Sequence, residues 1–252
     1  MKNININELL GKPSSLSETF YSKIINKSSK KGKNIKEKFK ISYKGYNRFN
    51  EILLPKISPE KMNRTSLITC LENRQSKRKF SKVQLTKKQI SVLLKYGCGE
   101  KNTRTCNYSS RYYPSAGAKY PLEIYLISLN TDYKKGLYHY YVRNHSLEEL
   151  TLLSKLNYKN YFTGNFQKMF KNISCILLIS AIFKRTTIKY SDRGYNYVMM
   201  EVGSIYQNLG LISSYLGLGC CVIGGFYEEP FNKLIDIDGL SESVIISVAI
   251  GK

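Results

Sequence analysis

One stretch of the chain, which begins at Lys189 and Tyr190 and ends at Phe226, constrains the fold more than any other. After the polar segment that opens it, apolar residues recur in steps of four and three. These residues are Val198, Val202, Ile205, Leu209, Ile212 and Leu216. The spacing predicts a long amphipathic helix with one face packed on a core.

The second half of this stretch is rich in glycine. Gly217 or Gly219 should end the helix, because glycine tolerates the left-handed conformation of a helix cap. A short apolar run then leads to Gly224 and Gly225. At such a pair the backbone can approach a flat or charged ligand closely.

Composition limits the class of protein. A chain of 252 residues can form one domain with an extension, and 42% hydrophobic residues are ordinary for a globular protein. No apolar run is long enough to span a membrane and the N-terminus lacks a signal core, so we expect a cytoplasmic protein.

Six cysteines without a C-x-x-C pair, and only two histidines, argue against a zinc site or disulfide scaffold. Reduced thiols are the expectation.

The chain is strongly basic, with 40 basic and 18 acidic residues and a formal net charge of +22. That charge is compatible with an anionic partner, but the lysines are scattered and compositional bias explains them equally well. No nucleic-acid recognition motif accompanies the charge, so we expect no nucleic-acid partner. Residues 1–65, which include the basic stretch 27–40, are predicted to be an extension that acts as a docking arm or a structural wrap. The folded domain is predicted to span residues 66–252.

An R-x-S-x-R pattern at Arg74, Ser76 and Arg78 is a candidate phosphate site. Arginine binds phosphate oxygens bidentately, and alternate side chains of an extended segment point the same way. A helix should follow, with Thr86 as its N-cap and Gln89 completing a capping box.

The remaining pattern is that of an α+β domain. A run of small residues, Pro114 to Ala118, precedes a strand over 122–129 and an aromatic hairpin over 136–150. Apolar runs at 172–183 and 243–251 predict buried strands. The two histidines, His139 and His145, fall in the hairpin and are expected to pack there rather than to catalyse.

In order, these motifs resemble the SagB-type, McbC-like azoline dehydrogenases of the nitroreductase-like flavoprotein superfamily. The matching pieces are R-x-S-x-R, R-x-x-P-S-x-G, the Lys-Tyr pair, EVGSIYQNLGLISSYLGLG and IGGF. The resemblance implies a nitroreductase-like fold, with a central mixed or antiparallel sheet flanked by helices and a long central helix at a homodimer interface. It also implies FMN as the cofactor.

The resemblance assigns roles to individual residues. Lys189 and Tyr190 match the catalytic pair. The cofactor-binding positions are Arg74, Ser76 and Arg78 for the phosphate, Pro114, Ser115, Ala116, Gly117, Gly224 and Gly225 beside the flavin ring, and Lys252 in place of a basic residue that many nitroreductases carry further along.

The implied reaction converts thiazolines or oxazolines of a ribosomally made precursor peptide to azoles, as in bacteriocin and toxin biosynthesis, beside a YcaO-type cyclodehydratase. The azoline loses one proton and one hydride. A lysine can take the proton only when its pKa falls toward neutrality, which burial beside a flavin and other cations favours.

Two other functions fit the same sequence. A general NAD(P)H-dependent nitro- or quinone reductase needs no further dinucleotide motif, and a non-enzymatic binder of nucleic acid or membrane surfaces accounts for the charge. The absorbance spectrum of the purified protein separates the flavoproteins from the binder.

Overall fold

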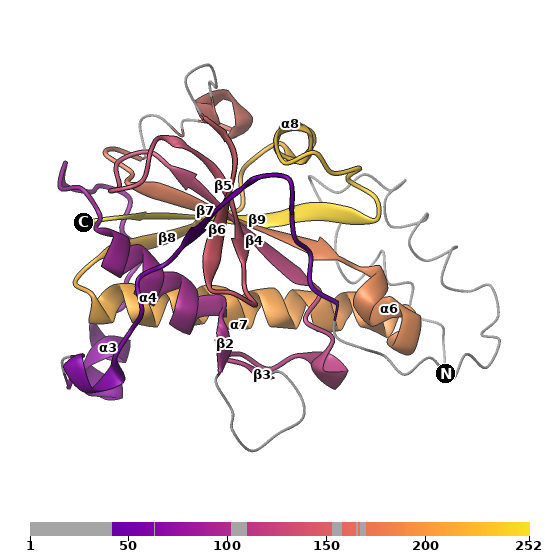
Figure 1. Ribbon diagram of the computed structural model, residues 1–252, viewed down its shortest axis with the longest axis horizontal. Coiled ribbons are helices and arrows are strands. Elements are labelled where there is room, and N and C mark those ends of the chain that lie inside the picture. The colour runs from indigo at the N-terminus through magenta and orange to yellow at the C-terminus, as the bar shows by residue number, and fades with distance from the viewer. Residues whose placement is uncertain (1–41, 63, 102–109, 153–157, 165, 167–169) are drawn as a thin grey trace.

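A seven-stranded antiparallel sheet forms the centre of the protein (Figure 1). The computed structural model describes residues 42–252 except 63, 102–109, 153–157, 165 and 167–169. The strands run in the order β1-β6-β5-β4-β7-β9-β8, and every neighbouring pair is antiparallel. Their bounds are β1 Asn50–Leu53, β4 Leu122–Ser128, β5 Gly136–Tyr141, β6 Ser146–Leu152, β7 Cys175–Ile182, β8 Gly219–Ile223 and β9 Glu242–Gly251. A separate two-stranded ribbon joins β2 (Glu100–Lys101) to β3 (Ser110–Arg111).

Helices flank both faces of the sheet. They are α3 Leu67–Asn73, α4 Lys87–Cys98, α6 Lys184–Tyr190, α7 Arg193–Tyr215 and α8 Glu228–Leu234, with short 3-10 turns η1 Pro59–Lys61, η2 Ala116–Ala118 and η3 Tyr158–Tyr161. The α7 helix crosses one face, with α3 and α6 at its opposite ends (Figure 1). The α8 helix packs on the other face, where Phe231 is fully buried. The predicted α+β fold class is confirmed.

Alternating side chains of β4 supply both layers of the core. Leu122, Ile124 and Leu126 join the cluster beneath α4 and α7, whereas Tyr125 and Ile127 join the cluster beneath α8. The period of two places successive side chains on opposite faces, so a sheet covered on both sides needs an almost continuously apolar strand.

The long helix predicted from the spacing of apolar residues is α7. Val198, Val202, Ile205 and Leu209 are buried on its inner face. The helix ends at Tyr215, and Gly217 follows its C-cap with a φ of 65°, the left-handed conformation that glycine accepts. Two other predictions are confirmed: Thr86 and Gln89 form a capping box at α4, and the apolar run at 172–183 forms the buried strand β7.

The N-terminal part of the chain contributes to the sheet. Residues 50–53 form the edge strand β1, in which Glu51 pairs with Glu148 of β6, and Leu54 is in the core. The basic stretch 27–40 lies outside the described residues. The boundary between residues 65 and 66 stays a prediction.

Among the described residues, no helix is long and apolar enough to cross a membrane. Five of the six cysteines are described, and all five are free and buried. The same part of the chain contains no group of three His, Cys, Asp or Glu side chains placed to hold a metal ion.

Candidate functional site

Lys189 and Tyr190 form the last turn of α6, immediately before the chain turns into α7. The sequence analysis described only a polar segment here and did not predict this helix. The sequence KRTTIKY has no apolar period, and its helix is formed against α7 instead. Gly194 of α7 allows this contact, because a Cβ atom there would lie 2.8 Å from the Thr187 Cα atom. Ser191, at φ 49° and ψ −135°, makes the sharp turn between the helices.

The small-residue segment lies directly against this pair. Gly117 has a φ of 60°, and a Cβ atom at this position would lie 2.7 Å from the Tyr190 hydroxyl and 3.1 Å from Lys189 Nζ. Lys189 Nζ is also 5.1 Å from the centroid of the Tyr190 ring. The structure therefore brings three of the predicted site residues together. Lys189 is exposed in the single chain, so its amine can be buried only when another molecule binds over it.

The segment that carries Gly117 is a strained loop. Ala118 and Tyr120 have positive φ values of 52° and 46°, which L-residues rarely adopt. Ser115 closes the loop: its carbonyl accepts from the Ala118 amide at 3.0 Å and its hydroxyl from the Tyr120 amide at 2.8 Å. Such conformations persist only where the surroundings determine them. Ser115 thus has a role in shaping the loop beside any contact with a ligand.

Two charged residues behind this loop were missed by the sequence analysis. Glu201 of α7 is buried and hydrogen-bonded to the Ser115 hydroxyl, and its Oε1 atom has no hydrogen-bond partner among the described residues. Burial raises the pKa of Glu201 to about 7, although Ser115 and the Arg111 guanidinium oppose the shift. The buried Arg111 donates to the Tyr113 hydroxyl at 2.8 Å. Arg111 lies in the matched R-x-x-P-S-x-G pattern and Glu201 is the first residue of the matched EVGSIYQNLGLISSYLGLG stretch, so the motifs contained both residues but no role was assigned to either.

The predicted phosphate residues form a second cluster. Ser76 pairs in parallel with Cys220 at the start of β8, and this places Arg74 and Arg78 on either side of it. The Lys252 carbonyl accepts a hydrogen bond from the Ser81 amide, which brings Lys252 beside the segment that carries Arg78. All four predicted phosphate residues are exposed, so the three cationic side chains and the Ser76 hydroxyl are accessible to an anion.

Gly224 and Gly225 lie at the far end of β8 from that cluster. Five residues separate Cys220 from Gly225, which corresponds to about 16 Å of extended strand. Both glycines are exposed. A Cβ atom on Gly224 would meet only Ile246, at 3.9 Å, so one side of the backbone is open there.

The two clusters lie at opposite ends of α7. Arg74 packs on Gly210 near the C-terminal end of the helix, whereas Lys189 and Tyr190 precede Arg193 at its start. Seventeen residues of helix separate Gly210 from Arg193, which is roughly 25 Å at 1.5 Å per residue. One chain therefore does not bring its own phosphate cluster to its own Lys-Tyr pair.

Comparison with known proteins identifies the family. The family model described as the nitroreductase family matches residues 71–252. The protein belongs to the nitroreductase family. This confirms the family resemblance drawn from the sequence motifs.

Three relatives are similar to this nitroreductase-family chain. The Methanocaldococcus jannaschii protein MJ1384, which carries a provisional nitroreductase name, is 32% identical over 74% of this chain and 90% of its own length. The microcin B17-processing protein McbC of Escherichia coli is 32% identical over 51% of this chain and 49% of its own length. The trifolitoxin-processing protein TfxB of Rhizobium leguminosarum is 25% identical over 62% and 44%. The chain thus matches about half of each peptide-processing relative.

Solved structures share the fold. The E. coli microcin synthetase McbBCD complex, with truncated pro-MccB17 bound, matches with a TM-score of 0.61 and 23% identity over 90% of this chain and 80% of that chain. A nitroreductase-like protein of Desulfovibrio desulfuricans in complex with FMN matches with a TM-score of 0.50 and 13% identity over 75% and 87%. At these identities the likeness shows a common fold.

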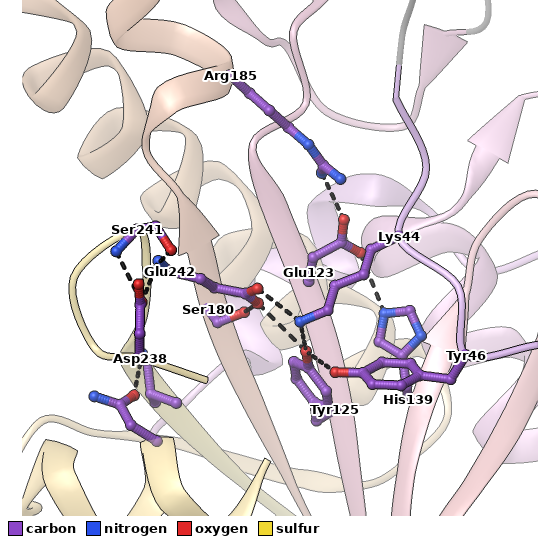
Figure 2. A network of polar contacts seen from close by, with 12 residues as sticks. Lys44, Tyr46, Glu123, Tyr125, His139, Ser180, Arg185, Asp238, Ser241 and Glu242 are labelled. Carbon is purple, nitrogen blue, oxygen red and sulfur yellow. Dashed lines mark hydrogen bonds and ion pairs between the residues drawn. The ribbon is translucent and has the colours of Figure 1, made fainter. Parts of the chain in front are cut away.

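This nitroreductase-family protein also contains a buried polar network on the sheet face opposite α7 (Figure 2). His139 lies between two carboxylates, with Nδ1 2.7 Å from Glu148 and Nε2 3.2 Å from Glu123. Burial lowers the pKa of His139, but hydrogen bonds and charge from the two glutamates outweigh burial and raise it overall. The chain segment before β1 covers the network, where Lys44 pairs with Glu242 at 2.6 Å and the Tyr46 amide donates to Glu148 at 2.7 Å.

Both histidines pack in the hairpin, as predicted. His139 has two carboxylate partners, which the pairing of β5 with β4 and β6 brings to it. His145 instead contacts the Ser91 hydroxyl at 2.9 Å and the Tyr140 hydroxyl at 2.8 Å. Burial and the nearby charge of Lys95 lower the pKa of His145 to about 4.

Proposed function

We propose that this protein is an FMN-dependent dehydrogenase that oxidises azoline rings of a ribosomally made peptide to azoles. The observation that supports this most directly is the contact of Gly117 with Lys189 and Tyr190. It joins the small-residue segment to an amine and a phenol, which are the groups that the reaction needs for proton transfer. The relationship to McbC and TfxB, both named for peptide processing, supports a peptide substrate.

The residues of this chain fit FMN. Arg74, Ser76, Arg78 and Lys252 are all exposed, and three cationic side chains with one hydroxyl are a donor set that suits a phosphate. The backbone at Gly117 and Gly224 carries no side chain that would keep a planar ring away. A structural relative of the same fold is in complex with FMN.

A second copy of the chain would complete the site. The phosphate cluster and the Lys-Tyr pair are roughly 25 Å apart along α7. The outer face of α7 exposes apolar residues, with Met200 68% exposed, and Leu67 and Ile68 of the adjoining α3 are exposed as well. We propose a homodimer in which the phosphate cluster of one copy faces the Lys-Tyr pair of the other.

In this reaction the azoline carbon loses a hydride, the neighbouring position loses a proton, and the ring gains a double bond. FMN, when bound, supplies the acceptor for the hydride. Lys189 takes the proton, and Tyr190 holds or relays it at its hydroxyl. A second copy and the substrate peptide, by covering the exposed Lys189, would exclude water and favour the neutral amine that acts as base.

The proposed partners follow from the same relatives. The peptide must first receive its azolines from a cyclodehydratase, for which a YcaO-type enzyme is our candidate. The McbBCD complex, solved with a pro-peptide bound, is an assembly of the kind we propose.

The test is a set of variants assayed on a cyclised peptide. Wild-type protein should bind FMN and remove two hydrogens per azoline, as measured by mass spectrometry. Lys189→Ala should abolish this oxidation while the flavin absorbance is retained. Lys184→Ala, which removes an exposed lysine from the same helix, is the control and should keep its activity. Retained oxidation in Lys189→Ala would remove Lys189 from the mechanism.

An NAD(P)H-dependent nitroreductase is the second candidate, because MJ1384, which the chain covers almost completely, carries that name. Rapid bleaching of the flavin by NAD(P)H, with no change in the mass of azoline peptides, would support this second function.

A further inference from the structure

The helix that carries Lys189 and Tyr190 is fixed to the sheet through Arg185. This residue lies one helical turn before Lys189, and its side chain is only 11% exposed. Its Nη1 atom donates to Glu123 Oε1 of β4 at 2.5 Å and to the Tyr120 carbonyl at 3.2 Å. Figure 2 shows the guanidinium pointing from α6 toward the Glu123 carboxylate.

Glu123 is a firm anchor for this contact. It is buried in β4, and its second oxygen, Oε2, is 3.2 Å from His139 Nε2. Burial alone would raise the pKa of Glu123, but the His139 hydrogen bond and the charges of Arg185, His139 and Arg111 lower it to about 2. The carboxylate therefore stays ionised and keeps its two partners.

The second acceptor belongs to the loop that touches the Lys-Tyr pair. Tyr120 ends the strained segment that begins at Ser115, and Gly117 lies within that segment against Lys189 and Tyr190. One nitrogen of Arg185 thus joins the helix that bears the pair to the loop that packs on it. Strained loops hold their shape only through such contacts.

We propose that Arg185 is a positioning residue, which sets the Lys189 amine and the Tyr190 hydroxyl relative to the 115–120 loop, with Glu123 and His139 orienting its guanidinium. The proposal rests on the proposed function, since it assigns Arg185 a task in that reaction. It goes beyond a structural ion pair, because displacement of about 1 Å at a reacting group can lower a rate by about 100-fold.

Arg185→Met and Arg185→Lys test this role, with Lys184→Met as the matched loss of an exposed cation one residue away. Arg185→Met should lower kcat on a cyclised peptide by about 10- to 100-fold with little change in KM, and FMN affinity should stay within about twofold. Arg185→Lys should recover part of kcat, because an ammonium can reach Glu123 but lacks the guanidinium's planar fork. Lys184→Met should behave as wild type.

A second measurement needs no turnover. Acetic anhydride acetylates neutral amines, so the rate at which Lys189 is labelled reports the protonation state and the accessibility of its amine. The exposed Lys233 is the internal reference. Arg185→Met and Glu123→Gln should each change Lys189 labelling by about threefold or more, and Lys184→Met should not.

The outcomes separate the two proposals. If wild-type protein does not oxidise azolines, the proposed function fails, and the labelling experiment still decides whether Arg185 positions Lys189. If Arg185→Met does not fold, Arg185→Lys and Glu123→Gln carry the test. Wild-type kcat and wild-type Lys189 labelling in the folded variants, with only a loss of thermal stability, would overturn the proposal and leave a structural ion pair.

Discussion

Gly117 shows how closely the backbone must approach the Lys-Tyr pair. A methyl group at this position would lie 2.7 Å from the Tyr190 hydroxyl, and the φ of 60° is unfavourable for any L-residue. We expect Gly117→Ala to displace the pair, to lower the free energy of unfolding by about 1 kcal/mol and to abolish oxidation. Denaturation and peptide mass spectrometry measure the two effects.

Gly217→Ala is the matched control for that variant. Gly217 has a φ of 65°, yet nothing lies within 4 Å of the position that an added Cβ atom would take. It should therefore cost a similar amount of stability and leave oxidation unchanged. Equal losses of activity in both variants would mean that backbone strain, rather than contact with the pair, explains the effect.

Glu201 predicts a pH dependence of stability. Its pKa is raised from 4.5 to about 7, so the folded protein holds this proton more tightly than the unfolded chain. Stability should fall as pH rises from 4.5 to 7, by up to about 3 kcal/mol from this group, and level off above 7. Glu201→Gln should remove this component, as measured by urea denaturation at pH 5 and pH 8. Glu60→Gln, at an exposed carboxylate of η1, is the control.

Motif residues and supporting residues differ in how visible they are in the sequence. Arg74, Gly117 and Lys189 belong to recognisable patterns, so a single sequence identified them. Arg185 lies in no such pattern, and Glu201 lies in a matched stretch that gives it no role. What they do depends on Glu123 and Ser115, which the fold brings to them from distant parts of the chain.

At the level of elements, the crossing of α6 over α7 controls where the pair lies. A Cβ atom on Gly194 would meet the Thr187 backbone at 2.8 Å, and backbone cannot move aside without shifting the helix. Gly194→Ala should therefore destabilise the protein by about 1–3 kcal/mol and reduce oxidation. Chemical denaturation and the peptide assay measure these changes.

Gly203→Ala, on the same helix, controls for helix propensity. Its added Cβ atom meets nothing nearer than the Tyr206 side chain at 3.8 Å, so stability should rise by about 0.5–1 kcal/mol. A destabilisation as large as that of Gly194→Ala would contradict the role given to the α6–α7 contact.

Elements with a strong period were predictable and α6 was not. The apolar spacing of α7 and the continuous apolar runs of β7 and β9 are properties of the local sequence. In α6 only Thr186 is buried, and the helix depends on its contacts with α7. Its existence is therefore a consequence of tertiary packing.

For the whole molecule, the proposed homodimer couples dimerisation to flavin binding. Met200→Glu, which places a charge on the outer face of α7, should shift the protein to monomer and weaken FMN binding together. Analytical ultracentrifugation and flavin titration measure the two quantities. Leu152→Glu, at a residue 50% exposed on β6, is the control. Full FMN affinity in a monomeric Met200→Glu would show that one chain suffices.

The distance between the two clusters could not be predicted from motif order. Arg74 and Lys189 each match the family, but only the placement of α3 and α6 at opposite ends of α7 shows how far apart they lie (Figure 1). The spacing of apolar residues predicts which face of a helix or strand is buried. It does not predict where along a neighbouring helix or strand that face packs.

The burial of the cysteines would matter if oxygen reoxidises the flavin of the proposed dehydrogenase. Turnover would then release hydrogen peroxide, which attacks thiolates far faster than thiols. Burial raises the pKa of Cys220 to about 11 and that of Cys98 to about 12, so both remain protonated at neutral pH. These sulfur atoms should survive many catalytic cycles without becoming sulfenic acids.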